Sequence, residues 1–435
     1  MPGSAKLFTR FLRFLAPGFL RVKKIDAFTI YLLMVGSSTF FFAVAFTTSA
    51  LYRFQMAGLD PLQLVLLGTT LELSVFLFEI PTGVVADIYS RRLSVIIGFG
   101  LIGMGLVLEG SRQQFMTILL AQGLWGIGYT FISGAQDAWL ADELGEERLT
   151  ATYLRGAQIS QVAALAGIIV NVALASIQLN LPLLVGGTGH VALAAFLILF
   201  MPEKGFVPAP QNERQSWQKM GVTFREGMSV IRGRPLLVTI LGIALVYGLY
   251  SEALDRLWEA HILDNFQLPV IDNLANVVWF GFINAAVMIV ALVTTEFVRR
   301  RASIFEHQQM VKVLFLLSAA IAAGLILFGL AQGIVGALFS YSMVAIVRKT
   351  LQPLYSAWIN RGIPTDVRAT VLSTYGQMDA AGQVLGGPLV GMAANRFGLR
   401  AAIVLAGVLL TPVLALYKRA YDQGEQQRST SHTAT

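Results

Sequence analysis

Two sets of six apolar stretches, separated by one long polar segment, constrain this chain more than any other feature. Each stretch is close to the roughly 20 residues that an α-helix needs to cross a bilayer. Because backbone amides inside a bilayer must be hydrogen-bonded within the protein, such stretches form helices. They cover residues 26–50, 61–86, 93–110, 115–137, 151–175 and 181–201, then 235–257, 273–297, 309–330, 334–357, 368–393 and 401–418. The sequence therefore predicts an all-α polytopic membrane protein with twelve transmembrane helices.

The balance of apolar and charged residues excludes a soluble protein. Hydrophobic residues make up 55% of the 435 residues and charged residues 13%, whereas a soluble domain carries about 25% charged residues. The absence of cysteine excludes disulfides and thiolate chemistry. The histidines are scattered, and neither a phosphate-binding loop nor a metalloprotease motif occurs. We therefore expect no enzyme activity, no metal and no cofactor.

The Lys and Arg residues indicate the orientation in the membrane. If the N-terminus is cytoplasmic, most of the 32 Lys and Arg residues fall in loops on that side, as the positive-inside rule requires. We therefore expect both termini in the cytoplasm. Since no organelle signal is visible, we expect a prokaryotic inner (plasma) membrane. The net charge of +7 then reflects contact with membrane lipids and not with nucleic acid, because the basic residues are spread over many short loops.

The chain divides into five predicted segments. Residues 1–25 are typical of a cytoplasmic amphipathic segment, and residues 26–201 form an N-terminal six-helix bundle. The prolines and charges of residues 202–234, with apolar residues at helical spacing, predict a cytoplasmic linker with an interfacial helix. Residues 235–418 form a C-terminal six-helix bundle. Residues 419–435 are polar and are predicted to be a disordered cytoplasmic tail.

The two halves also match in sequence after their second and fourth apolar stretches, with the same spacing from an acid to an arginine pair. Repeated halves indicate duplication and are typical of transporters, in which one bundle moves against the other to alternate access. We therefore expect two pseudo-symmetric six-helix bundles. The matching stretches are Asp87-Ile-Tyr-Ser-Arg91-Arg92 with Glu296-Phe-Val-Arg-Arg300-Arg301, and Ala138-Trp139-Leu140 with Ala357-Trp358-Ile359.

The first of these loops carries a family signature. Gly83-Val-Val-Ala-Asp87-Ile-Tyr-Ser-Arg91-Arg92 resembles the G-x-x-x-D-x-x-x-R-R loop of the major facilitator superfamily. With the repeat, the resemblance covers nearly the whole chain. It implies the major facilitator fold and a monomer that moves a small molecule, with the proton gradient and no cofactor as the energy source. Three further stretches resemble the tetracycline-resistance-like, drug:proton antiporter branch: Glu79-Ile-Pro-Thr-Gly83, residues 251–258, and Trp358-Ile-Asn-Arg-Gly-Ile-Pro364.

The sequence departs from this branch at several positions. Ile88 and Ser90 replace a basic residue and a glycine, and Leu119 stands where antiporters have an arginine. The Gly-Pro antiporter motif of the fifth span is missing between residues 156 and 175. Two functions therefore stay open. One is proton-coupled efflux of small lipophilic or amphipathic, drug-type compounds; the alternative is proton-coupled or facilitative uptake of a metabolite or lipid-like solute.

Charges at the inner ends of the second and fourth stretches of each half predict a cytoplasmic gate. An ion pair that forms only when the inner side is closed shifts the equilibrium between inward- and outward-facing states. The alternative is that these charges only set the topology. The candidate residues are Gly83, Asp87, Arg91, Arg92, Asp137, Asp142, Glu296, Arg300 and Arg301.

Four acids within the apolar stretches are candidates for proton coupling. Glu72 and Asp379 each lie about 17 Å into their stretch, near the midplane, where ionisable residues are costly and therefore functional by default. The resemblance implies that the second and eleventh spans face each other, so these two acids would share a proton. Glu252 and Asp255 predict an outer gate or a proton entry. The alternatives are an interfacial ion pair of Asp255 with Arg256, and acids hydrogen-bonded only for packing.

The resemblance also implies a substrate cavity lined by the first, fourth, seventh and tenth spans. Aromatic side chains there can stack on a flat amphipathic compound. An arginine there can neutralise an anion, pair with an acid, or extend to the headgroups. Packing is the alternative role for each aromatic residue. The candidates are Phe42, Trp125, Tyr129, Tyr247, Tyr250, Tyr341 and Arg348.

Overall fold

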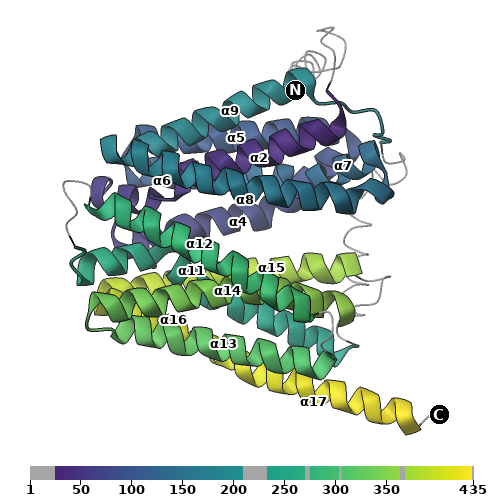
Figure 1. Ribbon diagram of the computed structural model, residues 1–435, viewed down its shortest axis with the longest axis vertical. Coiled ribbons are helices and arrows are strands. Elements are labelled where there is room, and N and C mark those ends of the chain that lie inside the picture. Colours follow the sequence, from purple (N-terminus) through teal and green to yellow (C-terminus); the bar gives the residue numbers. More distant parts are fainter. Residues whose placement is uncertain (1–24, 209–232, 270–274, 303–305, 363–367, 434–435) are drawn as a thin grey trace, which may run out of the picture. The chain divides into compact units, whose positions relative to one another are not determined.

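The computed structural model describes residues 25–208, 233–269, 275–302, 306–362 and 368–433, which form helices joined by short connections (Figure 1). Most of the predicted N-terminal amphipathic segment and the predicted interfacial helix of the linker lie outside these residues. Before the linker the helices are α2 (Ala27–Phe46), α3 (Ser49–Leu51), η1 (Tyr52–Met56), α4 (Pro61–Ile88), α5 (Arg91–Ser111), α6 (Phe115–Ile132), α7 (Ala135–Leu144), α8 (Glu146–Ile177) and α9 (Leu181–Phe200). After it they are α11 (Pro235–Asn265), α12 (Ala275–Ala302), α13 (His307–Leu330), α14 (Ile334–Gly362), α15 (Arg368–Phe397), α16 (Leu399–Leu410) and α17 (Pro412–Thr433).

The helices are long enough to cross a membrane. Among the described residues, 11 helical segments are both long and apolar enough to do so. α15 has 30 residues, and its acid, amides and glycines make it less apolar than the others. Together these are the twelve predicted spans. The prediction of an all-α polytopic membrane protein is confirmed.

Several helices end at residues other than those predicted. The predicted span 115–137 is divided into α6 and α7 at Gly134, whose φ of 73° lies in the left-handed region that favours glycine. The predicted first span continues past α2 into α3 and then into η1, a short π-helix. The predicted disordered tail is wrong for residues 419–433, because α17 continues to Thr433. Pro412 occupies a favourable first position, and the tail contains Glu, Gln and Arg, which are good helix formers.

The N-terminal end of α2 is fixed by a helix cap. The backbone N–H and the hydroxyl of Thr29 donate to the Asp26 carboxylate at 2.9 and 2.8 Å. These hydrogen bonds hold the pKa of Asp26 below its usual value, because they favour the charged form. Asp26 therefore satisfies a backbone donor that the first turn of a helix leaves without a partner.

Contacts divide the chain into two compact units. Unit 1 consists of residues 1–46, 77–112 and 116–214, and unit 2 of residues 47–76, 113–115 and 215–435. α4 contributes its first part to unit 2 and its last part, from Leu77, to unit 1. The predicted bundle boundaries, which keep α4 whole within residues 26–201, stay a prediction.

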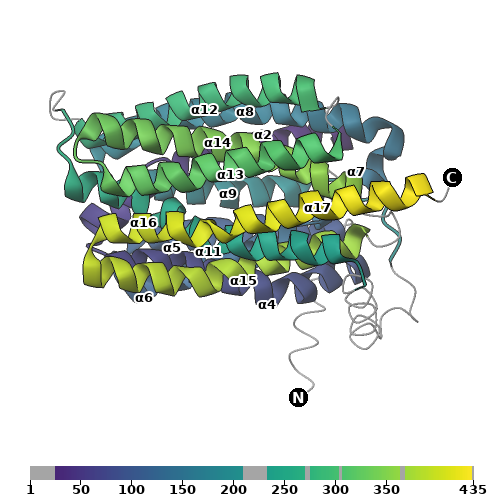
Figure 2. The same ribbon diagram turned by 90° about the horizontal axis from the view of Figure 1, so that it is seen from below.

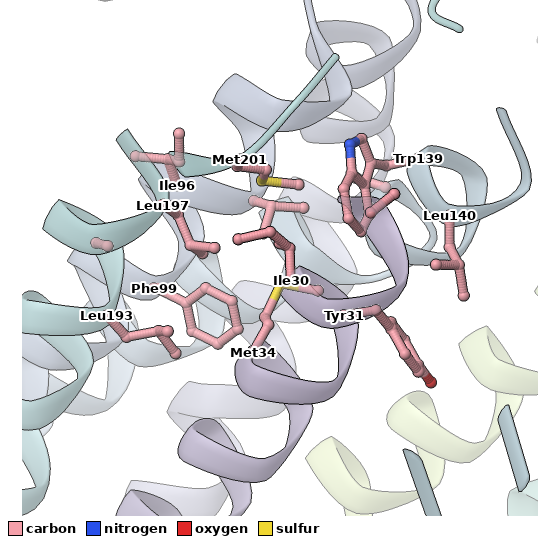
Figure 3. Close-up of a cluster of buried hydrophobic side chains, with 14 of the residues drawn as sticks. Ile30, Tyr31, Met34, Ile96, Phe99, Trp139, Leu140, Leu193, Leu197 and Met201 are labelled. Carbon is pink, nitrogen blue, oxygen red and sulfur yellow. The ribbon is translucent and has the colours of Figure 1, made fainter. Parts of the chain in front are cut away.

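The core of unit 1 is apolar and draws on α2, α5, α7 and α9 (Figure 3). Ile30 and Met34 of α2 lie beside Phe99 of α5, and all three are buried. Trp139 of α7 closes one end of the cluster, and its indole N–H donates to the carbonyl oxygen of Pro202 at 2.8 Å. Apolar contact therefore fixes where α7 and the start of the linker lie within unit 1.

In unit 2, α11 lies against α15, and α13 lies against α16 and α17 (Figure 2). α11 and α15 approach so closely that a Cβ on Gly248, Gly382 or Gly386 would overlap a backbone carbonyl oxygen of the other helix. Small residues at this spacing allow two helices to approach this closely. The contact fixes how α11 and α15 present their acids.

Candidate functional site

Three of the predicted proton-coupling acids lie on helices that meet inside unit 2. Glu252 of α11 is only 2% exposed, and its carboxylate lies against Gly68 of α4, where a Cβ would overlap it. Glu72 follows Gly68 by one helical turn, about 6 Å, and lies within the electrostatic reach of Glu252 and Asp379. Asp379 of α15 contacts Gly248, one turn before Glu252, through its carbonyl oxygen. We call Glu72, Glu252, Asp255 and Asp379 the carboxylate cluster.

Small residues allow these helices to meet. A Cβ on Gly387 of α15 would lie 2.5 Å from the Thr69 hydroxyl of α4 and 3.7 Å from Cγ of Glu252. Nearer the start of α4, the Asn395 side chain of α15 accepts a hydrogen bond from the backbone N–H of Leu62 at 3.1 Å. The first part of α4 therefore packs on α15, beside α11. This is the arrangement of the second and eleventh spans that the family resemblance implies.

Two arginines face the carboxylate cluster. Arg348 of α14 donates to both oxygens of Asp255 at 2.5 and 2.8 Å, and its guanidinium lies 5.9 Å from the ring centre of Tyr250. Arg256 lies 3.5 Å from the Glu252 carboxylate. The sequence left the partner of Arg348 open between a substrate, an acid and the headgroups; in the structure it is Asp255. Gln383 donates to Asp379 at 2.9 Å.

The cluster holds more acids than bases. Four carboxylates face two guanidinium groups, so full ionisation leaves an excess negative charge around Glu252, which is buried. An unbalanced buried charge is costly, and bound cations or protons remove it. Within the described part of the chain, no group of three or more acidic or histidine side chains is arranged to hold a metal ion.

In unit 1 the predicted gate residues Arg91 and Asp142 form an ion pair. Arg91 also donates to the carbonyl oxygen of Ala138 at 2.8 Å, and its guanidinium lies 5.9 Å from the ring centre of Phe206. The hydroxyl of Ser90 accepts from the N–H of Leu93 and so caps the first turn of α5. Residues of the signature loop are thus tied to α7.

Two acids that sequence reasoning missed hold the start of the linker. Glu203 accepts from the Ser90 hydroxyl at 2.7 Å and from the N–H of Arg92 at 2.9 Å. Glu143 of α7 accepts from the N–H of Gly205 at 2.8 Å. Both acids lie in polar segments, where hydropathy gives no signal. Only the nearness of Glu203 to the end of the sixth span hints at its role.

A buried acid of α5 was also missed. Glu109 is fully buried, and the Gln122 amide of α6 donates to it at 2.7 Å. Its signal in the sequence is an acid close to the end of an apolar stretch. This pair joins α5 to α6 within unit 1.

The other gate candidates lie on α4, α7 and α12. Asp87 is exposed at the end of α4. Asp137 lies within electrostatic reach of Tyr31 and Tyr153, whose rings meet edge to face at 5.9 Å. Gly83 and Glu296 lie within α4 and α12. The side chains of Arg300 and Arg301 lie outside what the structure describes.

The aromatic candidates of unit 1 divide into two places. The ring centres of Phe42 and Trp125 lie 6.3 Å apart, and those of Phe46 and Trp125 lie 4.8 Å apart. The ring of the buried His190 lies 4.5 Å from Phe42. Tyr129 is 51% exposed. The structure therefore joins Phe42 and Trp125 in one aromatic cluster and leaves Tyr129 at the surface of its unit.

The aromatic candidates of unit 2 are buried among other side chains. The Tyr247 hydroxyl lies 2.7 Å from Ser318 and 2.8 Å from the Tyr417 hydroxyl. Tyr341 stacks on Trp258 with ring centres 3.9 Å apart. Both contacts hold helices together, so the residues are in positions where packing dominates.

Unit 1 contains a pocket of about 750 Å³ along α2 and α8. Among the described residues that line it, the polar side chains are those of Thr29, Ser37 and Gln158, and none is charged. A volume of this size suits a drug-sized ligand. Its walls are formed by Thr29, Leu32, Leu33, Gly36, Ser37, Phe40, Phe41, Gln158, Ile159, Val162, Ala163 and Ala166.

Comparison with known proteins decides the family. Residues 27–387 match the Major Facilitator Superfamily. The chain belongs to this superfamily. A relative is the uncharacterized MFS-type transporter YxaM of Bacillus subtilis (strain 168), which is 24% identical over 375 residues, 82% of this chain and 87% of the relative.

Solved structures of other transporters share the fold of this superfamily member. A mutant of the nucleoside transporter NupG matches with a TM-score of 0.74 and 13% identity, over 91% of this chain and 100% of that chain. A bacterial homologue of the human lysosomal transporter Spinster matches with a TM-score of 0.72 and 15% identity, over 92% of this chain and 98% of that chain. A POT family transporter in complex with a thioalcohol-conjugated peptide matches with a TM-score of 0.69 and 12% identity, over 89% of this chain and 94% of that chain. At these identities the likeness shows the fold alone.

As a member of the major facilitator superfamily, the protein is a multi-pass membrane transporter of a small-molecule substrate and not an enzyme. The superfamily prediction is confirmed. The tetracycline-resistance-like branch stays a prediction, because the matches above identify the superfamily and not a branch within it.

Proposed function

We propose that this protein exports small lipophilic or amphipathic compounds in exchange for protons, by alternating access. The observation that carries the proposal is the carboxylate cluster of unit 2. Its acids outnumber the arginines that face them and come from three helices that meet within unit 2, and Glu72 and Asp379 lie near the middle of their apolar stretches. Acids at this depth mark ion pathways by default. We assign proton coupling to Glu72, Glu252, Asp255 and Asp379.

The substrate class follows from the pocket of unit 1. Its walls are apolar, and the uncharged polar side chains of Ser37 and Gln158 are available for hydrogen bonds. Pockets of this kind bind ligands mainly by apolar contact and use a few polar groups for orientation. A neutral or weakly charged lipophilic compound fits these walls better than a sugar or a peptide, whose many polar groups would be left without partners. The pocket-lining residues Phe40 and Phe41 add aromatic rings for stacking.

The ion pair of Arg91 with Asp142 supports a gate at the predicted cytoplasmic end of unit 1. Both side chains are partly buried, so their pairing is less screened by water than a surface pair. We expect the pair to favour one transport state, as a contact that exists in one state only must do. The Lys and Arg pattern supports a location in the inner membrane with both termini in the cytoplasm.

The alternative function is uptake of a metabolite or lipid-like solute. Leu119 favours it, because the resemblance to antiporters calls for an arginine at this position. Under this alternative the carboxylate cluster would couple proton entry to substrate entry or serve only for packing.

The test is proton movement in inside-out membrane vesicles, followed with a pH-sensitive dye. Tetracycline, tetraphenylphosphonium and glucose are added to energised vesicles that contain the protein. We expect proton release on addition of tetracycline or tetraphenylphosphonium, and its loss in Asp379→Asn. Asp264→Asn is the matched control, because Asp264 is an exposed acid at the end of α11.

One result would count against efflux, and another would count only against the coupling site. A proton signal with glucose alone would support the uptake carrier. Drug-triggered release that is equal in Asp379→Asn and in the wild type would remove Asp379 from the coupling site.

A further inference from the structure

Glu259 of α11 is a buried acid that the roles above do not use. It is 7% exposed, and its Oε2 atom has no hydrogen-bond partner. No basic side chain of the described residues forms a salt bridge with it. A charged carboxylate in such a place is costly, whereas a protonated one is not. The geometry therefore favours a Glu259 that carries a proton in this state of the protein.

Glu252, Arg256 and Glu259 form a ladder on one face of α11. Their spacing of four and then three residues places each beside the next. Arg256 lies 3.5 Å from the Glu252 carboxylate, but neither Nε of Arg256 nor Oε2 of Glu252 has a hydrogen-bond partner. The contact is therefore loose. Since Glu259 is one turn away on the other side, a rotation of the Arg256 side chain would bring the guanidinium to it.

The surroundings of Glu259 come from three elements. Arg53 of the π-helix η1 is 4% exposed and lies within electrostatic reach, as do Asp255 and Arg256 on α11 itself. Tyr341 of α14, stacked on Trp258, is also within electrostatic reach of Glu259. π-helical turns occur mostly as single irregular turns and are frequent at functional sites. Glu259 thus lies in an enclosed, polar site about 9 Å from the predicted outer end of α11.

We propose that Arg256 is shared between Glu252 and Glu259, and that the acid without the arginine holds a proton. When Arg256 moves to Glu259, the proton leaves Glu259 and Glu252 takes one up. The ladder then holds two acids, one arginine and one proton in both arrangements, so its net charge does not change. Glu259 becomes the first proton acceptor on the outer side, and Glu252 passes the proton to Glu72 and Asp379. This rests on the proposed proton coupling.

The first test needs no substrate. Infrared difference spectra of the purified protein, recorded after a change of pH, show the C=O stretch of protonated carboxyl groups. We expect Glu259→Gln to lose one such band that Asp264→Asn keeps. We expect Arg256→Gln to add a band, because both acids then lack the arginine. Bands of Glu259→Gln identical to those of the wild type would overturn the proposal.

The second test separates coupling from folding. In proteoliposomes, exchange of labelled tetracycline or tetraphenylphosphonium needs no net proton movement, whereas accumulation against a gradient does. One coupled proton supports about tenfold accumulation for each unit of pH difference. We expect Glu259→Gln to keep exchange and to lose accumulation, with Asp264→Asn like the wild type. Equal loss of both activities would indicate a structural role and overturn the proposal.

The two proposals fail in different ways. A wild-type protein that exchanges the probe but does not respond to a pH difference refutes the proposed proton coupling. A wild-type protein that accumulates the probe, with Glu259→Gln doing the same, refutes only the sharing of Arg256.

Discussion

Three buried hydroxyl groups in unit 2 predict a measurable and non-additive effect on stability. The Ser318 hydroxyl donates to the carbonyl oxygen of Leu314 at 2.7 Å, so it accepts from Tyr247 at 2.7 Å. Since Tyr247 donates there, it accepts from the Tyr417 hydroxyl at 2.8 Å. Each hydroxyl therefore donates once, along a chain from Tyr417 to Ser318. Tyr417 and Ser318 are fully buried.

Tyr247→Phe removes two hydrogen bonds and leaves the Tyr417 hydroxyl without an acceptor. A hydrogen bond between membrane helices is worth about 0.6 kcal/mol on average and up to about 1.7. A buried donor left alone costs about 1 kcal/mol or more. We therefore expect Tyr247→Phe to cost about 2 kcal/mol and Tyr417→Phe, which removes one bond, about 1 kcal/mol. The double variant removes the orphaned donor as well, so it should be no less stable than Tyr247→Phe.

The assay is thermal unfolding in detergent, followed by fluorescence-detected size-exclusion chromatography. Transport in vesicles is measured in parallel. Because Tyr247 is buried among side chains, we expect the apparent affinity of Tyr247→Phe for the transported probe to stay close to that of the wild type. Additive losses in the double variant would refute the chain of donors. An unchanged stability with a weaker affinity would return Tyr247 to the predicted substrate cavity.

Three further predictions test other contacts. Asp142→Arg should lower transport, and adding Arg91→Asp should restore part of it, as for a pair worth about 1 kcal/mol; vesicle transport measures both. Gly386→Val should prevent folding, because its side chain meets the α11 backbone, whereas Gly376→Val on the same helix meets no atom within 4 Å and should fold; chromatography of solubilised protein compares them. Asp26→Ala should destabilise α2 by about 1 kcal/mol at neutral pH. Because the folded pKa of Asp26 is lowered, that difference is fully present above about pH 4 and disappears as the pH falls through the folded pKa; melting curves over this range check it.

The sequence predicts those parts of the structure that depend on local chemistry. The twelve spans follow from length and hydropathy, since each must be long and apolar by itself. The glycines of the eleventh stretch predict a close helix contact, and α15 makes one with α11. Glu72, Glu252 and Asp379 are unusual because they are acids in apolar stretches, and this alone identifies them. The repeated acid and arginine spacing likewise pointed to Arg91.

Partners that are distant in the chain could not be predicted. Arg348 and Asp255 are 93 residues apart, and their pairing depends on how α14 and α11 are rotated about their axes. Hydropathy does not determine that rotation when a helix is apolar on all sides. For the same reason Glu203, which lies in a polar segment, gave no signal. The tail shows the opposite error, because polarity was taken as disorder although Glu, Gln and Arg favour a helix.

The division of α4 gives the proposed mechanism a physical link between its parts. Glu72 lies in the part of α4 that belongs to unit 2, and the signature glycine Gly83 lies in the part that belongs to unit 1. Pro81 lies between them and has no N–H. The carbonyl oxygen of Leu77, the first residue of α4 that belongs to unit 1, therefore lacks its usual helical hydrogen-bond donor. A helix bends most easily where such a bond is missing. In the mechanism that we propose, a change of charge at Glu72 and a change of pairing near Gly83 act on the same helix from opposite sides of Pro81.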